Sequence, residues 1–262
     1  MRKEFKDQYG PMALITGASA GIGSEFAMQL ASLGFDLVLV ARRKDALDGV
    51  ASSIGKVHNV RCTTVAVDLS TPDFMETLVP VVSSMEIGLL VNNAGFALTA
   101  PFLETNIEDE LRLLHLNTRA PLLLTHHFGQ LMVERGRGGV IFLASIAAFS
   151  SIPEWSNYCA TKSWNLMMGE ALFGELRPHG VDVLSLCPGA TRSEFGEVAG
   201  LRQPGAMEPG AVVRIALDSL GRMPKVVTGV RNRAIVTMEK FLPRRLNSML
   251  AGRVISHLKE RG

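Results

Sequence analysis

Short apolar runs alternate with longer helical patterns along most of this chain of 262 residues. The runs are almost continuously apolar, which is typical of strands that are covered on both faces of a sheet. Strands that alternate with helices favour parallel pairing, because the chain must cross the sheet between them. We therefore predict an α/β fold built on one doubly wound parallel sheet. Its strands are expected at residues 12–16, 36–41, 60–67, 88–91, 139–144, 181–187 and 226–229.

The segments between these runs have helical patterns, and no break in composition divides them. Hydrophobic residues make up 47% of the chain, which is too apolar for a disordered protein and sufficient for a core. We therefore predict a single domain over residues 1–262. Its helices are expected at residues 21–33, 44–54, from 71 onwards, 107–134, 157–177 and 211–220.

Charge, cysteines and hydropathy exclude several classes of protein. The chain has 27 Lys+Arg and 25 Asp+Glu, and this small net charge argues against nucleic acid as a partner. Its three cysteines are scattered and form neither a disulfide framework nor a metal-binding pair, so we predict no metal site and a reducing, cytoplasmic location. We expect neither a signal peptide nor a membrane span, because no apolar stretch is long enough.

A glycine-rich turn joins the first predicted strand to the first predicted helix. It contains Gly17, Ser19, Gly21, Ile22 and Gly23. Glycines at such a position let backbone N–H groups approach a phosphate, and the start of the helix adds a positive partial charge. The spacing is Gly-x-x-x-Gly-x-Gly, which differs from the general dinucleotide fingerprint. The strand–turn–helix context nevertheless predicts a dinucleotide site.

The same segment also matches Gly-x-Ser-x-Gly, the nucleophile elbow of α/β-hydrolases. A serine hydrolase that uses Ser19 is therefore an alternative function. Its weakness is position, because a hydrolase elbow follows several strands and only one strand precedes Ser19 here. Ser19 would otherwise be a turn residue that caps the helix.

The end of the second predicted strand favours NADP over NAD. An NAD site places an acidic residue about twenty residues beyond the glycines. Ala41 stands near that point, and Arg42 and Arg43 follow it. Guanidinium groups suit a 2′-phosphate, and we expect Arg42 to be the stronger ligand because it is nearer the strand end. Asp68 is a candidate partner of the adenine amine or a helix N-cap, and Leu69 beside it is assigned to the same site.

Tyr158 and Lys162 are four residues apart in a predicted helix, so they share one face. A tyrosine has a pKa of about 10, so forming a phenolate at pH 7 costs about 4 kcal/mol. An ammonium about 4 Å away offers about 4 kcal/mol at an effective dielectric of about 20. The pair therefore predicts a tyrosine acid/base. Ser145, at a strand end, is suited to hydrogen-bond a substrate oxygen where charge develops.

Taken together, these motifs resemble the short-chain dehydrogenase/reductase family over about residues 12 to 230. The resemblance implies a Rossmann domain with seven parallel strands. It also implies an NADP-dependent oxidoreductase that acts on a ketone or secondary alcohol, and a homodimer or homotetramer formed through residues 107–134 and 157–177. The segments that carry the resemblance are Thr16–Gly23, Asn92-Asn93-Ala94-Gly95, Asn117, Ser145, Tyr158-x-x-x-Lys162 and Pro188-Gly189.

The resemblance also implies a role for each matched residue. Tyr158 would donate a proton to the carbonyl as NADPH delivers hydride. Lys162 would lower the pKa of Tyr158 and bind the nicotinamide ribose, while Ser145 would polarise the carbonyl. Asn117 would hold a water in a proton relay. The remaining cofactor contacts would come from Asn93, Ala94, Gly95, Pro188, Gly189 and Thr191. A non-catalytic NADPH-binding protein is the second alternative to an oxidoreductase.

Two C-terminal segments differ in character from the rest. Residues 188–210 are rich in Gly and Pro and follow a strand end, so we predict an irregular substrate lid, whose apolar side chains suggest a hydrophobic substrate. Residues 231–262 form a basic extension with apolar residues at helical spacing. It is expected to pack on the protein, with a cover over the pocket, a subunit interface or an amphipathic helix on a membrane surface as alternatives.

Overall fold

The computed structural model describes residues 2–200, 204–239 and 241–258 of the chain. Seven parallel strands form one sheet in the order β3-β2-β1-β4-β5-β6-β7. This order starts at β1 and winds outward in both directions, as in a Rossmann fold, and it confirms the predicted fold class. The strands are β1 (Met12–Thr16), β2 (Asp36–Ala41), β3 (Cys62–Ala66), β4 (Ile87–Asn92), β5 (Gly138–Leu143), β6 (Val181–Cys187) and β7 (Lys225–Val227).

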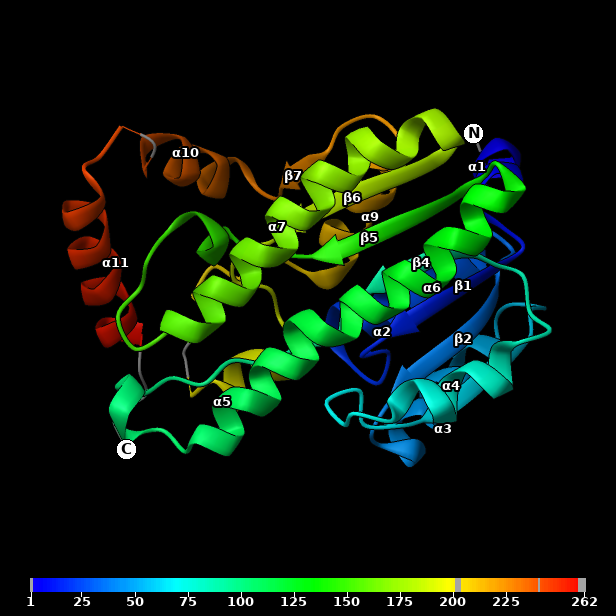
Figure 1. The fold of residues 1–262 in the computed structure, drawn as a ribbon, viewed down its shortest axis with the longest axis horizontal. Coiled ribbons are helices and arrows are strands. Elements are labelled where there is room, and N and C mark those ends of the chain that lie inside the picture. The colour runs from blue at the N-terminus through cyan, green and yellow to red at the C-terminus, as the bar shows by residue number, and fades with distance from the viewer. Residues whose placement is uncertain (1, 201–203, 240, 259–262) are drawn as a thin grey trace.

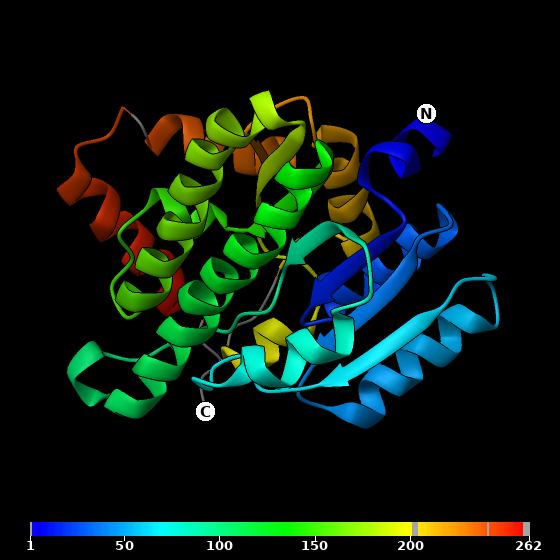
Figure 2. The ribbon, with the colours of Figure 1, turned by 45° about the vertical axis from the view of Figure 1, so that its right-hand side comes forward.

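Helices cover both faces of the sheet (Figure 1). One face packs against α2 (Gly21–Ser32), α3 (Lys44–Gly55) and α9 (Pro209–Ser219). The other face packs against α4 (Phe74–Val82), α6 (Ala120–Arg135) and α7 (Ser156–Leu176), of which α6 and α7 cross the sheet towards the viewer in Figure 1. The turned view in Figure 2 shows the same two helices side by side over the strands.

Alternation along the strands explains why both faces are apolar. In β1, Ala13 and Ile15 join the core on the α2 side, whereas Met12 and Leu14 join the core on the α4 side. Successive side chains of a strand point to opposite faces, so a strand between two helical layers must be apolar at every position. All five residues of β1 are buried, as the continuous apolar run predicted.

The predicted helix over residues 107–134 is interrupted. It consists of α5 (Ile107–Leu114), a π-helical turn from His115 to Arg119, and α6. Pro121 has no N–H, so it cannot donate to the carbonyl of Asn117 one turn earlier. The amide of Asn165 in α7 donates to that carbonyl instead, at 2.8 Å. The interruption thus connects α6 to α7 at a residue that the sequence assigned to the site.

Several boundaries also differ from the sequence predictions. The helix expected from Thr71 begins at Phe74, because residues 71–73 form turns, and the third strand is shorter than 60–67. An N-terminal helix, α1 (Arg2–Tyr9), was not predicted. Residues 188–210 are not irregular throughout, since they contain α8 (Glu194–Val198) and a bridge between Thr191 and Met207. Residues 201–203 of the predicted lid lie outside the described residues.

The basic extension forms two helices, α10 (Val230–Glu239) and α11 (Arg244–Leu258). Both lie beyond the carboxyl ends of the strands in Figure 1, where the arrowheads point towards them. Gly252 of α11 packs near Pro153, in the loop before α7: a Cβ built on it would lie 3.1 Å from Pro153 Cγ. No helix in the described part of the chain is long and apolar enough to cross a membrane. Residues 240 and 259–262 of the extension lie outside the described residues.

Helix α7 lies unusually close to the sheet at Gly169. A Cβ built on Gly169 would lie 2.1 Å from Ser185 Oγ in β6 and 3.2 Å from Phe142 Cδ2 in β5. Ser185 is fully buried, and its hydroxyl donates to the carbonyl of Leu166 at 3.1 Å. The side chain therefore has little freedom to move away. Glycine at this position lets α7 approach the strands that carry the site.

We expect Gly169→Ala to destabilise the fold by about 1–3 kcal/mol, the usual range for an overpacked core. The matched control is Gly174→Ala in the same helix, where a Cβ would meet nothing within 4 Å. This control should raise stability by about 0.5–1 kcal/mol, because glycine is unfavourable within helices. Urea unfolding measures both. Adding Ser185→Ala should recover part of the loss, and equal effects of the two glycine substitutions would contradict the contact.

Candidate active site

A cavity of about 640 Å³ opens at the carboxyl ends of the strands. It runs from the β1–α2 turn, past the ends of β2, β4, β5 and β6, to α10 and α11. Ligands of open α/β sheets bind at this edge, where the strand order reverses. The predicted site residues that line it are Gly17, Ser19, Gly21, Ile22, Arg42, Arg43, Leu69, Asn93, Ala94, Gly95, Ser145, Tyr158, Lys162, Pro188, Gly189 and Thr191.

The glycine-rich turn leaves the start of α2 open towards the cavity. Gly17 and Gly21 adopt φ of 65° and 58°, and a Cβ on Gly23 would lie 2.2 Å from the carbonyl oxygen of Gly17. The N-cap of α2 is Ala20 rather than Ser19, and no side chain caps its free N–H groups. The expectation that Ser19 caps the helix is therefore wrong. Uncapped N–H groups at a helix start suit a phosphate.

The two arginines at the end of β2 have different partners. Arg43 Nη2 lies 2.6 Å from Glu194 Oε2 at the start of α8, and both side chains are about half exposed. Arg42 makes no hydrogen bond or ion pair that involves another described residue, although its charge acts on Asp68. Arg42 therefore has a free guanidinium beside the cavity, whereas Arg43 would have to leave Glu194 to bind a phosphate.

Asp68 does not line the cavity in this structure, although Leu69 does. Its carboxylate accepts hydrogen bonds from the backbone N–H and hydroxyl of Ser70, at 2.9 and 2.7 Å. Burial raises the pKa of Asp68, but these bonds and the charges of Arg42 and Arg112 outweigh burial and hold the pKa below its usual value. Asp68 is also not the helix N-cap, because Asp73 precedes α4.

The cavity has two halves: a cofactor half, lined by the glycine-rich turn and the two arginines, and an apolar half. Three polar side chains lie where these halves meet. Tyr158 and Lys162 come from α7, and Ser145 follows β5; they are 5%, 4% and 9% exposed. Lys162 Nζ lies 5.7 Å from the centre of the Tyr158 ring and donates to the carbonyl of Leu143 at 2.7 Å. The helical spacing predicted this shared face correctly.

Burial governs the ionisation of this group. It raises the pKa of Tyr158 above its usual value, and a hydrogen bond with Ser145 only partly opposes the increase. Burial also lowers the pKa of Lys162 to about 8. The expectation that Lys162 lowers the pKa of Tyr158 is therefore not met in this structure, because the desolvation of the phenolate outweighs the hydrogen bond with Ser145. Tyr158 therefore keeps its proton in this structure.

Asn117 and Gly23 do not line the cavity but lie directly behind residues that do. The amide of Asn117 donates to Thr161 Oγ1 at 3.1 Å and to the carbonyl of Phe96 at 3.0 Å, and its Oδ1 accepts from the N–H of Phe96. A Cβ on Gly95 would lie 2.9 Å from Asn117 Oδ1 and 3.4 Å from Lys162 Nζ. Gly95 thus allows Asn117 and Lys162 to approach the cavity from behind.

The other half of the cavity has apolar walls that sequence reasoning largely missed. Trp155 and Phe195 pack against the Tyr158 ring, with centroids 4.9 and 5.7 Å away. Ile152 precedes α7, and Ile235 comes from α10. Phe195 belongs to the predicted lid at residues 188–210, whose apolar side chains suggested a hydrophobic substrate. The loop holding Ile152 and Trp155 gave no periodic signal, and the position of Ile235 depends on how α10 packs against η3 (Ile146–Phe149).

Ser19 lacks the partners of a hydrolase nucleophile. It lines the cavity beside the glycines, but no histidine lies in the cavity wall among the described residues. A serine nucleophile needs an adjacent base to remove its proton. The hydrolase alternative therefore has no support.

Relatives identified by sequence are oxidoreductases of one family. The chain matches the family described as short chain dehydrogenase over residues 11–202. It is 30% identical over 241 residues to the very-long-chain 3-oxoacyl-CoA reductase of Rattus norvegicus, covering 90% of this chain and 76% of the relative. It is 32% identical to the enzyme of that name from Phaeosphaeria nodorum, covering 81% of this chain and only 64% of the relative.

Solved structures support the same family. A short-chain dehydrogenase from Sphingobium yanoikuyae in complex with NADPH superposes with a TM-score of 0.79 at 31% identity, covering 97% of this chain and 98% of that one. A structure from work on 7beta-hydroxysteroid dehydrogenase stereoselectivity superposes with a TM-score of 0.88 at 28% identity, covering 95% of this chain and 99% of that one. The fold, the motifs in their order and these matches lead to one conclusion: the chain belongs to the short-chain dehydrogenase family of oxidoreductases.

Proposed function

We propose that the protein transfers a hydride between NADP(H) and the carbonyl or secondary alcohol carbon of a hydrophobic compound. The observation that carries this proposal is the buried group of Ser145, Tyr158 and Lys162 between an open glycine-rich turn and an apolar pocket. The bound nicotinamide would supply the hydride. A survey of hydrophobic ketones and alcohols, assayed by NADPH absorbance, tests this proposal, and turnover of no such compound would contradict it.

The residues at the cavity support a proton-transfer role for Tyr158. Its phenol carries its proton at neutral pH, and burial raises the pKa further, so the proton is present to be donated to a carbonyl oxygen. Ser145 lies within hydrogen-bonding reach of Tyr158 and is suited to hold the same oxygen as charge develops. The ammonium of Lys162, fixed by the Leu143 carbonyl, would stabilise the phenolate that remains and bind the nicotinamide ribose. Asn117 would hold a relay water behind it.

The shape and charge of the cleft support NADP as the cofactor. The uncapped start of α2 offers N–H groups to the diphosphate, and Asn93, Ala94 and Gly95 form the adjacent wall. Arg42 has no ion-pair partner among the described residues and is free to bind a 2′-phosphate. Pro188, Gly189 and Thr191 would contact the nicotinamide end.

The apolar pocket supports a hydrophobic substrate, with the 3-oxoacyl or steroid-like classes as the candidates. The rat relative is named for a 3-oxoacyl-CoA substrate, and a Comamonas testosteroni structure with a TM-score of 0.77 at 28% identity is described as a bulky-bulky ketone specific alcohol dehydrogenase. Walls formed by Ile152, Trp155 and Phe195 suit either class.

Assembly and location remain proposals. Homo-oligomerisation through α5, α6 and α7 is supported by apolar side chains that these helices expose, among them Leu114, Leu122 and Met167. The cytoplasmic location stays a prediction. Contact of α11 with a membrane surface is also still a prediction. It is supported by the exposed apolar residues of this helix, which lie beside two arginines: Leu246, Met249 and Leu250, with Arg244 and Arg245.

Replacing the phenol should separate binding from catalysis. Tyr158→Phe keeps the ring that packs on Trp155 and Phe195 but removes the proton donor. Turnover should fall by about 10²–10⁴-fold, with NADPH affinity within a few-fold of wild type. Steady-state kinetics and cofactor titration check both. Turnover close to that of wild type would refute the assignment of Tyr158.

The two arginines provide a matched pair for cofactor choice. Losing a charged hydrogen bond costs about 1.5–3 kcal/mol, so Arg42→Ala should weaken NADPH binding roughly 10- to 150-fold. NADH lacks the 2′-phosphate and should lose much less. Arg43→Ala should have the smaller effect, because Arg43 already pairs with Glu194, and Ala41→Asp should favour NADH. Calorimetric titration of each variant with both cofactors measures these affinities. An unchanged NADPH affinity in Arg42→Ala would exclude Arg42 as the ligand of the 2′-phosphate.

The lowered pKa of Lys162 predicts a pH dependence of stability. In the unfolded chain a lysine has a pKa of about 10.4, whereas burial lowers the pKa of Lys162 to about 8. Between these values the unfolded chain binds more protons, so stability rises with pH. The cofactor-free wild type should gain about 2 kcal/mol from pH 7 to 10 relative to Lys162→Met, as measured by urea unfolding. Parallel pH profiles of the two proteins would show that Lys162 is not desolvated.

A further inference from the structure

One acidic side chain lies in the apolar half of the cavity. Glu239 lines the wall together with Ile235, one turn earlier in α10, and Ala251 of α11. Its Oε2 is buried and has no hydrogen-bond partner among the described residues. None of the ion pairs found in the described chain includes Glu239. A partly buried carboxylate with one oxygen enclosed and unpartnered is costly, so its presence in an apolar wall calls for a ligand.

The position of Glu239 in its helix adds to this cost. It is the last residue of α10, where the helix dipole places negative partial charge. A carboxylate in the last turn is therefore unfavourable, and a lysine or arginine would be the stabilising choice. A residue that conflicts with local stability and with its surroundings is expected where a function requires it.

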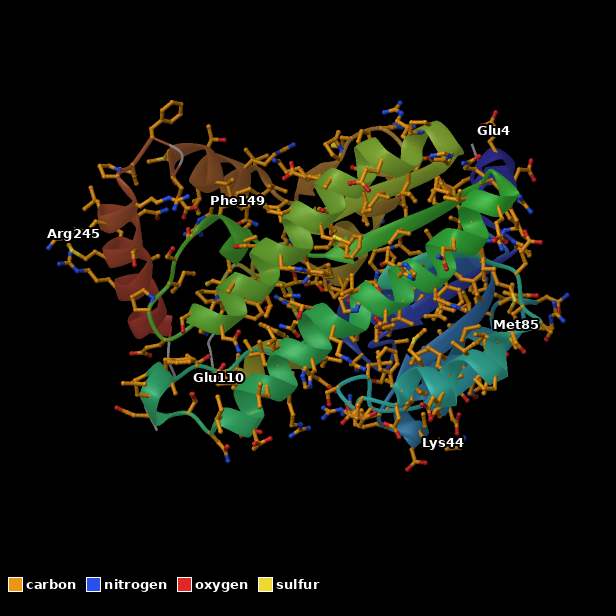
Figure 3. The ribbon with its side chains drawn as sticks, in the orientation of Figure 1. Glu4, Lys44, Met85, Glu110, Phe149 and Arg245 are labelled. Atoms are coloured by element: carbon orange, nitrogen blue, oxygen red, sulfur yellow. The ribbon has the colours of Figure 1, made fainter. Side chains whose placement is uncertain are left out.

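The place of α10 assigns Glu239 to the substrate rather than to the cofactor. Helix α10 packs against the short η3 turn, Ile146–Phe149, which directly follows Ser145. Phe149 of this turn is labelled in Figure 3, where it lies beside α10. The cofactor half, with its glycines and arginines, is formed by α2 and β2 instead. Glu239 thus lies on the side of Ser145 that is remote from the arginines.

We propose that Glu239 binds a hydrogen-bond donor, a hydroxyl or an ammonium, at the end of the substrate remote from the reacting carbonyl. This inference rests on the proposed function and narrows its substrate class. The substrate is a hydrophobic ketone or secondary alcohol with a polar donor at its far end. A plain hydrocarbon leaves the carboxylate unpaired, and a carboxylate at the same place is repelled by it.

A matched set of ligands tests the proposal. The set is a series of rigid hydrophobic ketones with one skeleton, whose remote end carries hydrogen, hydroxyl, ammonium or carboxylate. We expect wild type to favour the hydroxyl or ammonium ketone over the plain one by roughly 10- to 150-fold in kcat/KM, the range for a charged hydrogen bond. The carboxylate ketone should be the poorest. The hydroxyl and ammonium members show which donor the site prefers.

Variants of Glu239 connect the preference to this side chain. Glu239→Gln keeps an acceptor oxygen but loses the charge, so it should keep part of the hydroxyl preference and tolerate the carboxylate ketone. Glu239→Leu should favour the plain ketone. Glu175→Gln, an exposed carboxylate in α7, is the control for the loss of one charge and should match wild type. NADPH affinity should be unchanged in every variant, which also reports on folding.

A measurement of ligand binding distinguishes a failure of this inference from a failure of the proposed function. Trp155 lines the cavity, so quenching of its fluorescence reports ligand affinity in the presence of NADP⁺ without turnover. If no ketone is reduced, the proposed function fails, and the affinity ratios still test Glu239. Equal affinities and equal kcat/KM across the set, or the same ratios in Glu239→Leu as in wild type, would overturn the inference.

Discussion

The close approach of α7 to the sheet determines the geometry of the candidate active site. Gly169 brings the helix onto β6, where Ser185 leaves no room for a larger residue. One end of α7 is fixed in addition by Asn157, which donates to the buried carboxylate of Glu110 in α5 at 2.7 Å (Figure 3). Tyr158 and Lys162 follow within the next two turns. Their side chains reach the cavity because the whole helix is held against the strand ends.

Burial gives the polar group its chemical character. Lys162 donates a hydrogen bond to the backbone carbonyl of Leu143, and burial of its ammonium group lowers its pKa to about 8. Tyr158 is enclosed by Trp155 and Phe195, which raises its pKa. A cofactor in the cleft would change these surroundings, because it would bring hydroxyl groups and charge next to both side chains. In the cofactor-free protein, burial therefore keeps the tyrosine protonated.

The sequence predicted the fold and many of the residues that line the cavity, because both depend on local patterns. Continuous apolar runs indicated the strands, and the Tyr158–Lys162 spacing indicated a shared helical face. The π turn at Asn117 was missed, because it depends on a contact between two helices. Pro121 leaves the carbonyl of Asn117 without a donor, and the side-chain amide of Asn165 donates to it instead. Glu239 was missed for a similar reason. Its proximity to the cavity results from the packing of α10, which no spacing in the chain specifies.

The transfer of a labelled hydride tests the central claim most directly. The protein is incubated with a hydrophobic ketone and NADPH that carries deuterium in place of both hydrogens at C4 of the nicotinamide, and the product is examined by mass spectrometry and chiral chromatography. Direct transfer predicts one deuterium on the carbinol carbon of the alcohol product, formed with a single stereochemistry. An alcohol without deuterium, or consumption of NADPH with no alcohol formed, would contradict the account of this cavity as a carbonyl-reducing active site.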